Sequence, residues 1–498
     1  MQTLRQPVLV GVGQLVNRAA DPGEVMEPLE MMAAVSRRAV EDAEIPQRLA
    51  DIDSLTVINC ISHAYADPPG QLAARLGMRP SDRVYTSMGG NSPQWRINET
   101  AERIAAGAVR LALIVGAEAM HGLQLARRAG AKLDWGEAGT PETVGERRWG
   151  NNDTEQRHHA QMPTNVYPLF ENALRARRGW SIARQRGHLA VLCARMAAVA
   201  RDNPYAWFRD GKSAEEIATV NDGNRMIAFP YPKFMNAIIS VDQAAALLMT
   251  DAATARELGI PERKWVYVRG CGDATDHWYV SDRVNLWSSP AIRIAGQRAL
   301  AQARLGIEQI DHFDLYSCFP CAVQIGADML GIPVDDPRPL TVTGGLPYHG
   351  GPGNNYSTHA VACMVERLRA ALGAHGLVSG VGWYLTKHAI GVYSSAAPDH
   401  PFVREDPKTY QRLVDAEPHP ELVPAYGGPA TVEAYTVQHD RDGRPATGIV
   451  VASLPDGRRC WANLTDPAIL ERIEREEFIG QPGKVRHHEP TQTNLFEP

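Results

Sequence analysis

A short internal repeat constrains the fold of this chain more than any other feature. Residues 51–60 read DIDSLTVINC, and residues 309–318 read QIDHFDLYSC. An isoleucine, an aspartate and the final cysteine agree at the same places in both segments. Each segment is followed by a glycine-rich turn, a predicted helix and a second apolar segment, so the order of elements repeats as well. This pattern indicates either two unrelated βα units or a duplicated fold whose halves place equivalent loops at one shared site.

Apolar runs alternate with amphipathic stretches in the N-terminal part of the chain. Residues 7–14 (PVLVGVGQ) and 111–117 (LALIVGA) are apolar and rich in β-branched side chains, which is typical of buried strands. Helical spacing of apolar positions begins at Leu29, and a second helix is expected at about 97–106, ending at Gly107. This alternation predicts an α/β fold with a mostly parallel sheet covered on both faces.

The length and the changing character of the sequence predict several units. A chain of 498 residues is too long for one simple core. We expect an insertion that covers the site, a proline-rich linker, and a small β-rich domain whose turns are signalled by DRDGRP and LPDGR. The predicted boundaries are 1–134 with 236–268 for the first half, 135–235 for the insertion, 269–395 for the second half, 396–428 for the linker, 429–480 for the β-rich domain and 481–498 for a loose polar tail.

Composition excludes several classes of partner. A net charge of −6 gives no electrostatic reason to bind nucleic acid or an anionic membrane. No stretch approaches the roughly 18 consecutive apolar residues of a membrane span, and the opening MQTLRQPVLVGVGQL lacks the apolar core of an export signal. The seven cysteines are scattered, which suits a reducing compartment. We therefore expect a cytoplasmic protein with no membrane span and no nucleic-acid partner.

Several short motifs have weak functional meaning. Cys318-Phe319-Pro320-Cys321 has the spacing of a redox dithiol or half a zinc site, but no second pair completes a metal site. Buried thiols, or one thiol at an active site, explain it better. Gly11-Val12-Gly13 lacks the third glycine of a dinucleotide fingerprint. His158-His159 and His487-His488 lie in polar segments and are expected at the surface. No metal site is expected.

The strongest candidate site is the glycine-rich run GGLPYHGGPGNN at residues 344–355. Dense glycine lets a ligand approach the backbone and leaves N–H groups free to bind an anion or oxyanion. A helix starting near Ser357 would add its positive N-terminal end. Tyr348 and His349 supply acid/base groups, and the two asparagines supply hydrogen bonds. The alternative is a tight turn whose polar groups are all satisfied.

These features together resemble the thiolase superfamily, in particular the sterol-carrier-type, acetyl-CoA acetyltransferase-like proteins with an additional C-terminal domain. NETAERIAAGAVRLALIVGAEAM is similar to the helix and strand after their nucleophile, and VLVGVGQL to their first unit. DLYSCF falls at their Asn-Glu-Ala-Phe or His-Asp-Cys-Phe block, GGLPYHGGPG at their Gly-His-Pro loop, and residues 430–465 at their small barrel-like addition. The resemblance implies the duplicated five-layered α/β thiolase fold, a CoA thioester as substrate or ligand with no other cofactor, and a site where the halves meet.

The resemblance also places the catalytic positions of the family on this sequence. The nucleophilic cysteine falls on Gly90, the late cysteine near Ser379, and the histidine of Gly-His-Pro on Gly351, two residues after His349. Only Cys318 matches a family cysteine, one that some members use as an acid/base. The implied catalytic residues are Tyr316, Cys318, Tyr348 and His349, and the implied oxyanion- and substrate-binding residues are Asn91, Ser92, Gly350, Gly351, Asn354 and Asn355.

Three functions remain open on this evidence. The first is carbon–carbon bond chemistry in lipid or steroid degradation without a covalent acyl-enzyme, including retro-aldol cleavage by tyrosine and histidine. The second is acyl transfer with Cys318 or Ser92 as nucleophile. The third is acyl-CoA binding without catalysis. In each case we expect a monomer or homodimer. A polar tyrosine-lined pocket favours the first, an exposed Cys318 of low pKa the second, and a blocked pocket the third.

Overall fold

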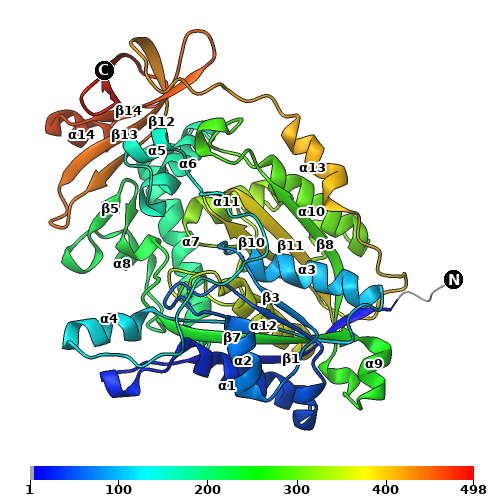
Figure 1. Cartoon of the computed structure of the whole chain (residues 1–498). Helices are drawn as coiled ribbons and strands as arrows, with labels where there is room; N and C mark the ends of the chain where they lie inside the picture. Colours follow the sequence, from blue (N-terminus) through cyan, green and yellow to red (C-terminus); the bar gives the residue numbers. More distant parts are fainter. Residues whose placement is uncertain (1–4) are drawn as a thin grey trace.

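The computed structural model describes residues 5–498 (Figure 1). One nine-stranded mixed sheet runs through both halves of its core. Its strand order is β3-β2-β4-β7-β1-β8-β11-β10-β9. The first five of these belong to the N-terminal half and the last four to the C-terminal half. The strands are β1 (Pro7–Val16), β2 (Ser54–Val57), β3 (Asp82–Tyr85), β4 (Leu111–Ala119), β7 (Asp242–Asp251), β8 (Val266–Thr275), β9 (His312–Asp314), β10 (His375–Gly382) and β11 (Lys387–Ser394).

The sheet confirms the duplication. The two repeated segments form β2 and β9, and each pairs in parallel with the strand that follows the next central helix, β4 in one half and β10 in the other. The first strands of the halves, β1 and β8, pair at the centre of the sheet, where Val8 lies opposite Tyr267. The second half has no counterpart of β3 among the described residues.

The prediction of a mostly parallel sheet was wrong. Only the pairs β2–β3, β2–β4 and β9–β10 are parallel, and the other five neighbouring pairs are antiparallel. The β10–β11 pair shows the physical reason, because residues 383–386 connect these strands directly. A short turn can join only antiparallel neighbours, whereas parallel neighbours need a long crossover.

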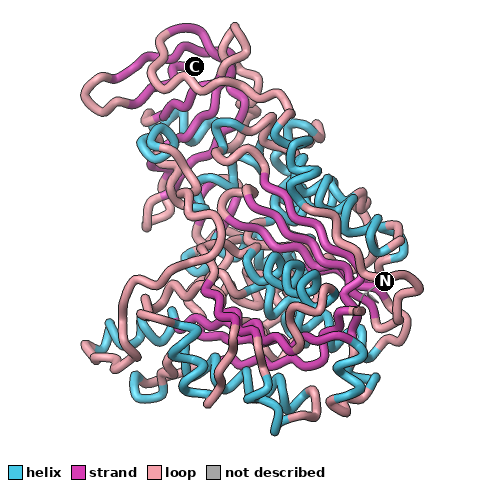
Figure 2. The backbone as a smooth tube through the Cα atoms, turned by 45° about the vertical axis from the view of Figure 1, so that its right-hand side comes forward, coloured by secondary structure: helices cyan, strands magenta, loops and turns pink. Residues whose placement is uncertain are grey.

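Helices complete a five-layered core. The central helices α3 (Ser92–Ala105) and α12 (Tyr356–Ala370) contact each other and strands of both halves. Figure 2 shows them enclosed between two groups of strands. The outer helices are α1 (Pro28–Asp42) and α2 (Pro68–Leu76) on the N-terminal half, and α10 (Pro290–Ala303) and α11 (Pro320–Leu330) on the C-terminal half.

The Gly-x-Gly motif near the N-terminus has a packing role. A Cβ added to Gly11 would lie 2.0 Å from the carbonyl oxygen of Ala39 in α1. The second half repeats this contact, because a Cβ at Gly270 of β8 would lie 1.9 Å from the carbonyl oxygen of Ala299 in α10. Glycine is therefore needed in both first strands so that the outer helix can approach the backbone.

The insertion carries helices and two short strands that reach the C-terminal domain. The remaining helices and short strands before β8 are α4 (Met120–Ala129), α5 (Asp153–Arg157), α6 (Pro163–Arg177), α7 (Ile182–Asp202), α8 (Ala214–Ala218), β5 (Met226–Ala228), β6 (Tyr231–Pro232) and α9 (Ala252–Glu257). Strand β5 pairs with β12 of the C-terminal domain through Ala228 and Gln438. The expected linker 396–428 is not without structure, because it contains α13 (Pro407–Asp415).

A closed five-stranded barrel forms the C-terminal domain, at the top of Figure 1. The pairings β12–β13, β13–β14, β14–β16, β16–β15 and β15–β12 close it. The expected loose tail at 481–498 was wrong, because this segment supplies two strands in which Val485 and Phe496 are buried. Its elements are β12 (Gly428–His439), β13 (Pro445–Ser453), β14 (Arg459–Leu464), α14 (Pro467–Ile473), β15 (Pro482–His488) and β16 (Thr493–Glu497).

Buried polar contacts fix the barrel to the rest of the molecule. The guanidinium of Arg459 donates to the carbonyl oxygens of Ser281 (2.8 Å) and Arg283 (2.7 Å). His158 was expected at the surface, but it is fully buried. Its Nδ1 donates to the carbonyl oxygen of Thr154, and its Nε2 accepts the N–H of Asn494 in β16 (2.9 Å). A neutral imidazole therefore links the insertion to the barrel.

A loop of the same chain lies along the β3 edge of the large sheet. Thr86, which follows edge strand β3, forms a bridge with Val144, and Tyr65 forms one with Ala138. Because an uncovered edge strand invites pairing with another chain, this loop protects the sheet from such pairing. Within residues 5–498, the helices are all too short or too polar to cross a bilayer.

Candidate active site

The two glycine-rich loops meet where α3 and α12 begin. The N–H of Gly89 donates to Oδ1 of Asn354 (2.8 Å), and the hydroxyl of Ser357 donates to the carbonyl oxygen of Gly90 (3.0 Å). Asn355 donates to the carbonyl oxygen of Gly116 in β4 (2.7 Å). The structure therefore brings the equivalent loops of the two halves to one junction, as the duplicated fold requires.

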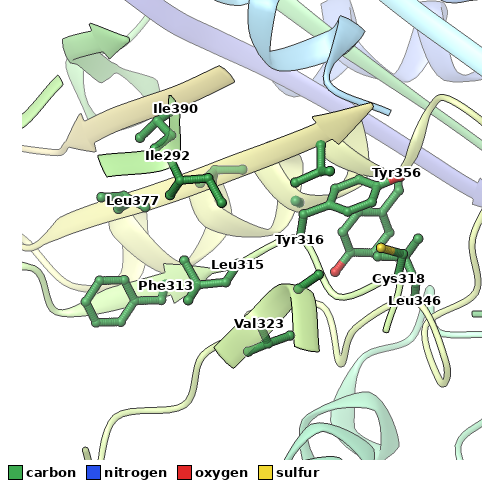
Figure 3. Packing of buried hydrophobic residues seen from close by; sticks show 14 of the residues in the cluster. Ile292, Phe313, Leu315, Tyr316, Cys318, Val323, Leu346, Tyr356, Leu377 and Ile390 are labelled. Carbon is green, nitrogen blue, oxygen red and sulfur yellow. The ribbon is translucent and has the colours of Figure 1, made fainter. Parts of the chain in front are cut away.

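Tyr316 fills the space beside Gly90. A Cβ added to Gly90 would lie 2.1 Å from the hydroxyl oxygen of Tyr316 and 2.6 Å from the carbonyl oxygen of Val381. The backbone N–H of Tyr316 donates to the hydroxyl of Ser379 in β10 (2.9 Å). Figure 3 shows the Tyr316 ring beside the ring of Tyr356 and the side chain of Cys318. No side chain fits at position 90 while Tyr316 holds this place.

The two cysteines after Tyr316 are buried thiols. Burial raises the pKa of Cys318 to about 12, so this thiol keeps its proton at neutral pH. The thiol of Cys321 donates to the carbonyl oxygen of Tyr167 (3.3 Å). Between them, Phe319 stacks on the ring of Tyr167 with centroids 4.4 Å apart. Neither cysteine has the exposed, cationic surroundings of a reactive thiolate.

Tyr348 and His349 are also buried, and they contact different parts of the molecule. The hydroxyl of Tyr348 donates to the carbonyl oxygen of Phe234 in the insertion (3.0 Å). The ring of His349 lies edge-on to Tyr356 (5.7 Å) and to His359 (5.0 Å) of α12. Burial lowers the pKa of His349 to about 4, so the imidazole is neutral at pH 7. Its Nε2 has no partner within residues 5–498.

Most of the predicted oxyanion donors already have protein partners. Gly351 follows Gly350 in the loop, and its N–H donates to the carbonyl oxygen of Ile238 (2.8 Å). The hydroxyl of Ser92 donates to the carbonyl oxygen of Ser87 (3.2 Å). With both loop asparagines bonded as well, these groups hold the junction together.

Sequence reasoning missed two buried carboxylates at this junction. Asp314, at the end of β9, accepts hydrogen bonds from Thr341, Thr343 and Tyr356 and so anchors the glycine-rich loop. Glu118, at the end of β4, accepts the N–H groups of the loop at residues 61–62, and burial raises its pKa to about 7. The only sequence signal was an acidic residue at the carboxyl end of each apolar strand.

Comparison with known proteins identifies the family of this chain. A crystal structure of a monomeric SCP2-thiolase-like protein type 1 from Mycobacterium smegmatis is 34% identical, covers 99% of both chains and superposes with a TM-score of 0.85. The chain belongs to the SCP2-thiolase-like protein type 1 family. Residues 410–490 match the thiolase-like protein type 1 additional C-terminal domain. No curated protein matches this chain.

More distant structures share the fold of this SCP2-thiolase-like protein. The Ltp2-ChsH2(DUF35) aldolase structure is 16% identical, with a TM-score of 0.59. The match covers 78% of this chain and 97% of the aldolase chain. An acetyl-CoA acetyltransferase from Syntrophomonas wolfei is 16% identical, with a TM-score of 0.56, and covers 79% of this chain and 100% of its own. At these identities the likeness concerns the fold alone.

Proposed function

We propose that this SCP2-thiolase-like protein binds an acyl-CoA thioester without forming a covalent acyl-enzyme. The observation that carries the proposal is the contact between Gly90 and Tyr316, which replaces the nucleophile of thiolases by a closely packed hydroxyl. Thiolase-type acyl transfer requires an activated thiolate at that place. The duplicated fold, with two helix N-termini converging, keeps the architecture in which the resemblance expects the thioester.

Acyl transfer through another residue fits the geometry poorly. Cys318 is buried and its pKa is raised, and the Ser92 hydroxyl donates to a backbone carbonyl rather than to a base. Activation of either group would require a neighbouring base or cation. Cysteine- or serine-dependent transfer is therefore the least supported of the three functions.

A second candidate function is retro-aldol cleavage of a β-hydroxyacyl-CoA in lipid or steroid degradation. The Tyr316 hydroxyl lies at the junction of the two halves, beside Gly90. Burial raises the pKa of Tyr316, so the phenol keeps its proton and can donate to the thioester oxygen as the enolate forms. In that reaction a base takes the proton of the β-hydroxyl, and the bond between Cα and Cβ breaks to give a carbonyl compound and an enolate. The enolate Cα then takes a proton and becomes the shortened acyl-CoA.

Entry of a thioester requires movement of the insertion. The N–H groups of Trp207 and Phe208 donate to the carbonyl oxygens of His349 (2.8 Å) and Tyr348 (2.9 Å). These bonds cover the glycine-rich loop with the insertion. We expect a bound thioester to change amide hydrogen exchange at both segments.

Calorimetry and mass spectrometry with a panel of CoA thioesters test the proposal. We expect binding of at least one thioester, altered exchange at 205–208 and 348–351, and no acyl adduct on any cysteine. Tyr316→Phe should abolish any turnover of β-hydroxyacyl-CoA. Tyr426→Phe, beside the barrel, is the matched control and should leave the turnover unchanged. Lack of affinity for every thioester would contradict ligand binding, and an acylated Cys318 would contradict the absence of a covalent intermediate.

We also propose a monomer in the cytoplasm. The covered edge of β3 supports the monomer, and the seven free thiols support a reducing compartment. Gel filtration with light scattering tests the first part of this proposal, and cell fractionation tests the second.

A further inference from the structure

A cavity of about 240 Å³ lies beside the first turn of α3, where Asn91 and Ser92 line it. The ends of β8 and β11, helix α13 and the loop at 145–146 enclose it. Its volume is below the roughly 300–1,000 Å³ of sites for drug-sized ligands, so its occupant is small. The polar side chains that matter here are Asn91, Glu146, Lys387, His388 and Lys408.

Lys387 is the unusual residue of this cavity. Its side chain is only 7% exposed, and its Nζ donates to the carbonyl oxygen of Met88 (2.5 Å). Within residues 5–498, no carboxylate lies within 4 Å of Nζ. Burial lowers the pKa of Lys387 to about 8, against the weaker opposing effect of Glu146. A substantial fraction of this amine is therefore neutral, and nucleophilic, near physiological pH.

Two further buried polar atoms at the cavity lack partners in the described part of the chain. They are Oδ1 of Asn91, on a side chain 8% exposed, and Nδ1 of His388, on one 3% exposed. Unsatisfied buried polar atoms are costly and are retained where a ligand or water completes them. Two glycines make the space for this arrangement. A Cβ at Gly89 would lie 2.7 Å from Nζ of Lys387, and one at Gly382 would lie 2.8 Å from its Cε.

A strained turn places Lys387 at the first position of β11. Trp383 and Leu385 in this turn have φ angles of 55° and 53°, a conformation that is unfavourable for side-chain-bearing residues. The buried Arg283 guanidinium donates to the carbonyl oxygens of Tyr384 (2.9 Å) and Leu385 (2.6 Å). The surrounding structure therefore stabilises an unfavourable backbone conformation. This conformation positions Lys387.

We propose that Lys387 condenses with a small carbonyl compound in this cavity. The amine nitrogen attacks the carbonyl carbon, and a carbon–nitrogen bond forms. The carbonyl oxygen leaves as water, and one proton taken from solvent leaves the product as an iminium. The single N–H of the iminium can still donate to Met88. This proposal goes beyond thioester binding and uses no CoA.

The walls of the cavity favour an uncharged aliphatic carbonyl compound. The exposed residues Glu146 and Lys408 have opposite charges, so neither an anion nor a cation is selected. Asp273 is already neutralised by Arg404 (2.6 Å). Trp95, Ala274 and Pro407 add apolar surface. A short aldehyde or ketone matches this combination of volume and polarity.

Reductive trapping in the full-length protein tests the proposal. The protein is incubated with propanal or butanal at low millimolar concentration and pH 7.5, treated with cyanoborohydride, and digested for peptide mass spectrometry. We expect an alkyl adduct on Lys387 at least 10-fold faster than on Lys408, which is exposed in the same cavity. Lys387→Arg should remove this fast adduct, while Lys408→Arg should leave it unchanged.

Two results would overturn the proposal. One is labelling of Lys387 no faster than that of the exposed lysines in a protein whose circular dichroism and melting temperature are native. The other is a fast adduct that persists elsewhere in the cavity after Lys387→Arg. Because no CoA is present, the outcome is independent of thioester binding, and either proposal can fail alone.

Discussion

The hydroxyl oxygen of Tyr316 lies 2.1 Å from the point where a side chain at Gly90 would begin. These residues come from different halves of the duplicated fold, at the start of α3 and after β9. The contact has a direct chemical meaning, since the resemblance places the thiolase nucleophile at position 90. At this position the chain has a packed contact between its halves and no side chain.

Gly90→Ala should therefore destabilise the protein by about 2 kcal/mol or more, through overlap with Tyr316 and with the Val381 carbonyl. Urea unfolding measures the loss. Adding Tyr316→Asn should recover part of it, so the double variant is more stable than the sum of the two single changes predicts. Gly187→Ala, in an open position of α7, is the control and should be neutral or stabilising. Equal effects of the two alanine substitutions would contradict the overlap.

Native cysteines should resist alkylation. All seven are buried, and at pH 8 a thiol like Cys318, with a pKa of about 12, is ionised in roughly one molecule in ten thousand. Iodoacetamide followed by intact mass analysis should show no adduct in the folded protein and seven in guanidinium chloride. Rapid modification of Cys318 alone would instead support acyl transfer.

Acid should weaken the attachment of the barrel through His158. Burial lowers the pKa of His158 to about 4 in the folded protein, below its ordinary value of 6.5. The unfolded chain therefore binds more protons between these values, so stability falls as pH drops from about 6.5 to 4. His158→Gln should reduce the stability change between pH 7 and pH 4.5 by about 2 kcal/mol in urea titrations. An unchanged pH profile would show that this histidine is not responsible.

Two neighbouring arginines, Arg458 and Arg459, should contribute very different amounts to the stability of the protein. Arg459 is 1% exposed and pairs with Glu433, besides bonding to two backbone carbonyls. Arg459→Met should cost about 3 kcal/mol, because it leaves these acceptors without a donor. It should also expose residues 396–428 to limited proteolysis. Arg458→Met, in the partly exposed adjacent position, should leave both the melting temperature and the digestion pattern unchanged. Equal effects of the two substitutions would refute the docking role of Arg459.

Local patterns predicted the elements, and the duplication followed from them. The apolar runs of β1 and β4 and the spacing of α12 were visible because burial on all sides leaves a continuous apolar signal. Strand direction was not visible, since it depends on how connections run between elements. The barrel strands β15 and β16 were missed because Val485 stands alone among polar residues and Leu495-Phe496 is an apolar run of only two residues.

The meeting of the two glycine-rich loops followed from the duplication that the sequence predicted. The sequence did not show that Asn354 and Asn355 bond to backbone groups of the other half. The filled space beside Gly90 depends on a tyrosine more than two hundred positions away. Lys387 carried no sequence motif. Its burial depends on Gly89, which is distant in sequence, on Gly382, and on a turn with positive φ angles.

The closure of the barrel has a consequence for the order of synthesis. Phe229, next to β5, packs into the barrel core, and its N–H donates to Val437. The barrel itself closes only when β16 emerges from the ribosome. At roughly 5–20 residues per second, the apolar face of the insertion stays uncovered for tens of seconds during translation. A nascent-chain chaperone would find its binding surface here until β12 emerges and Tyr435 stacks on Phe229.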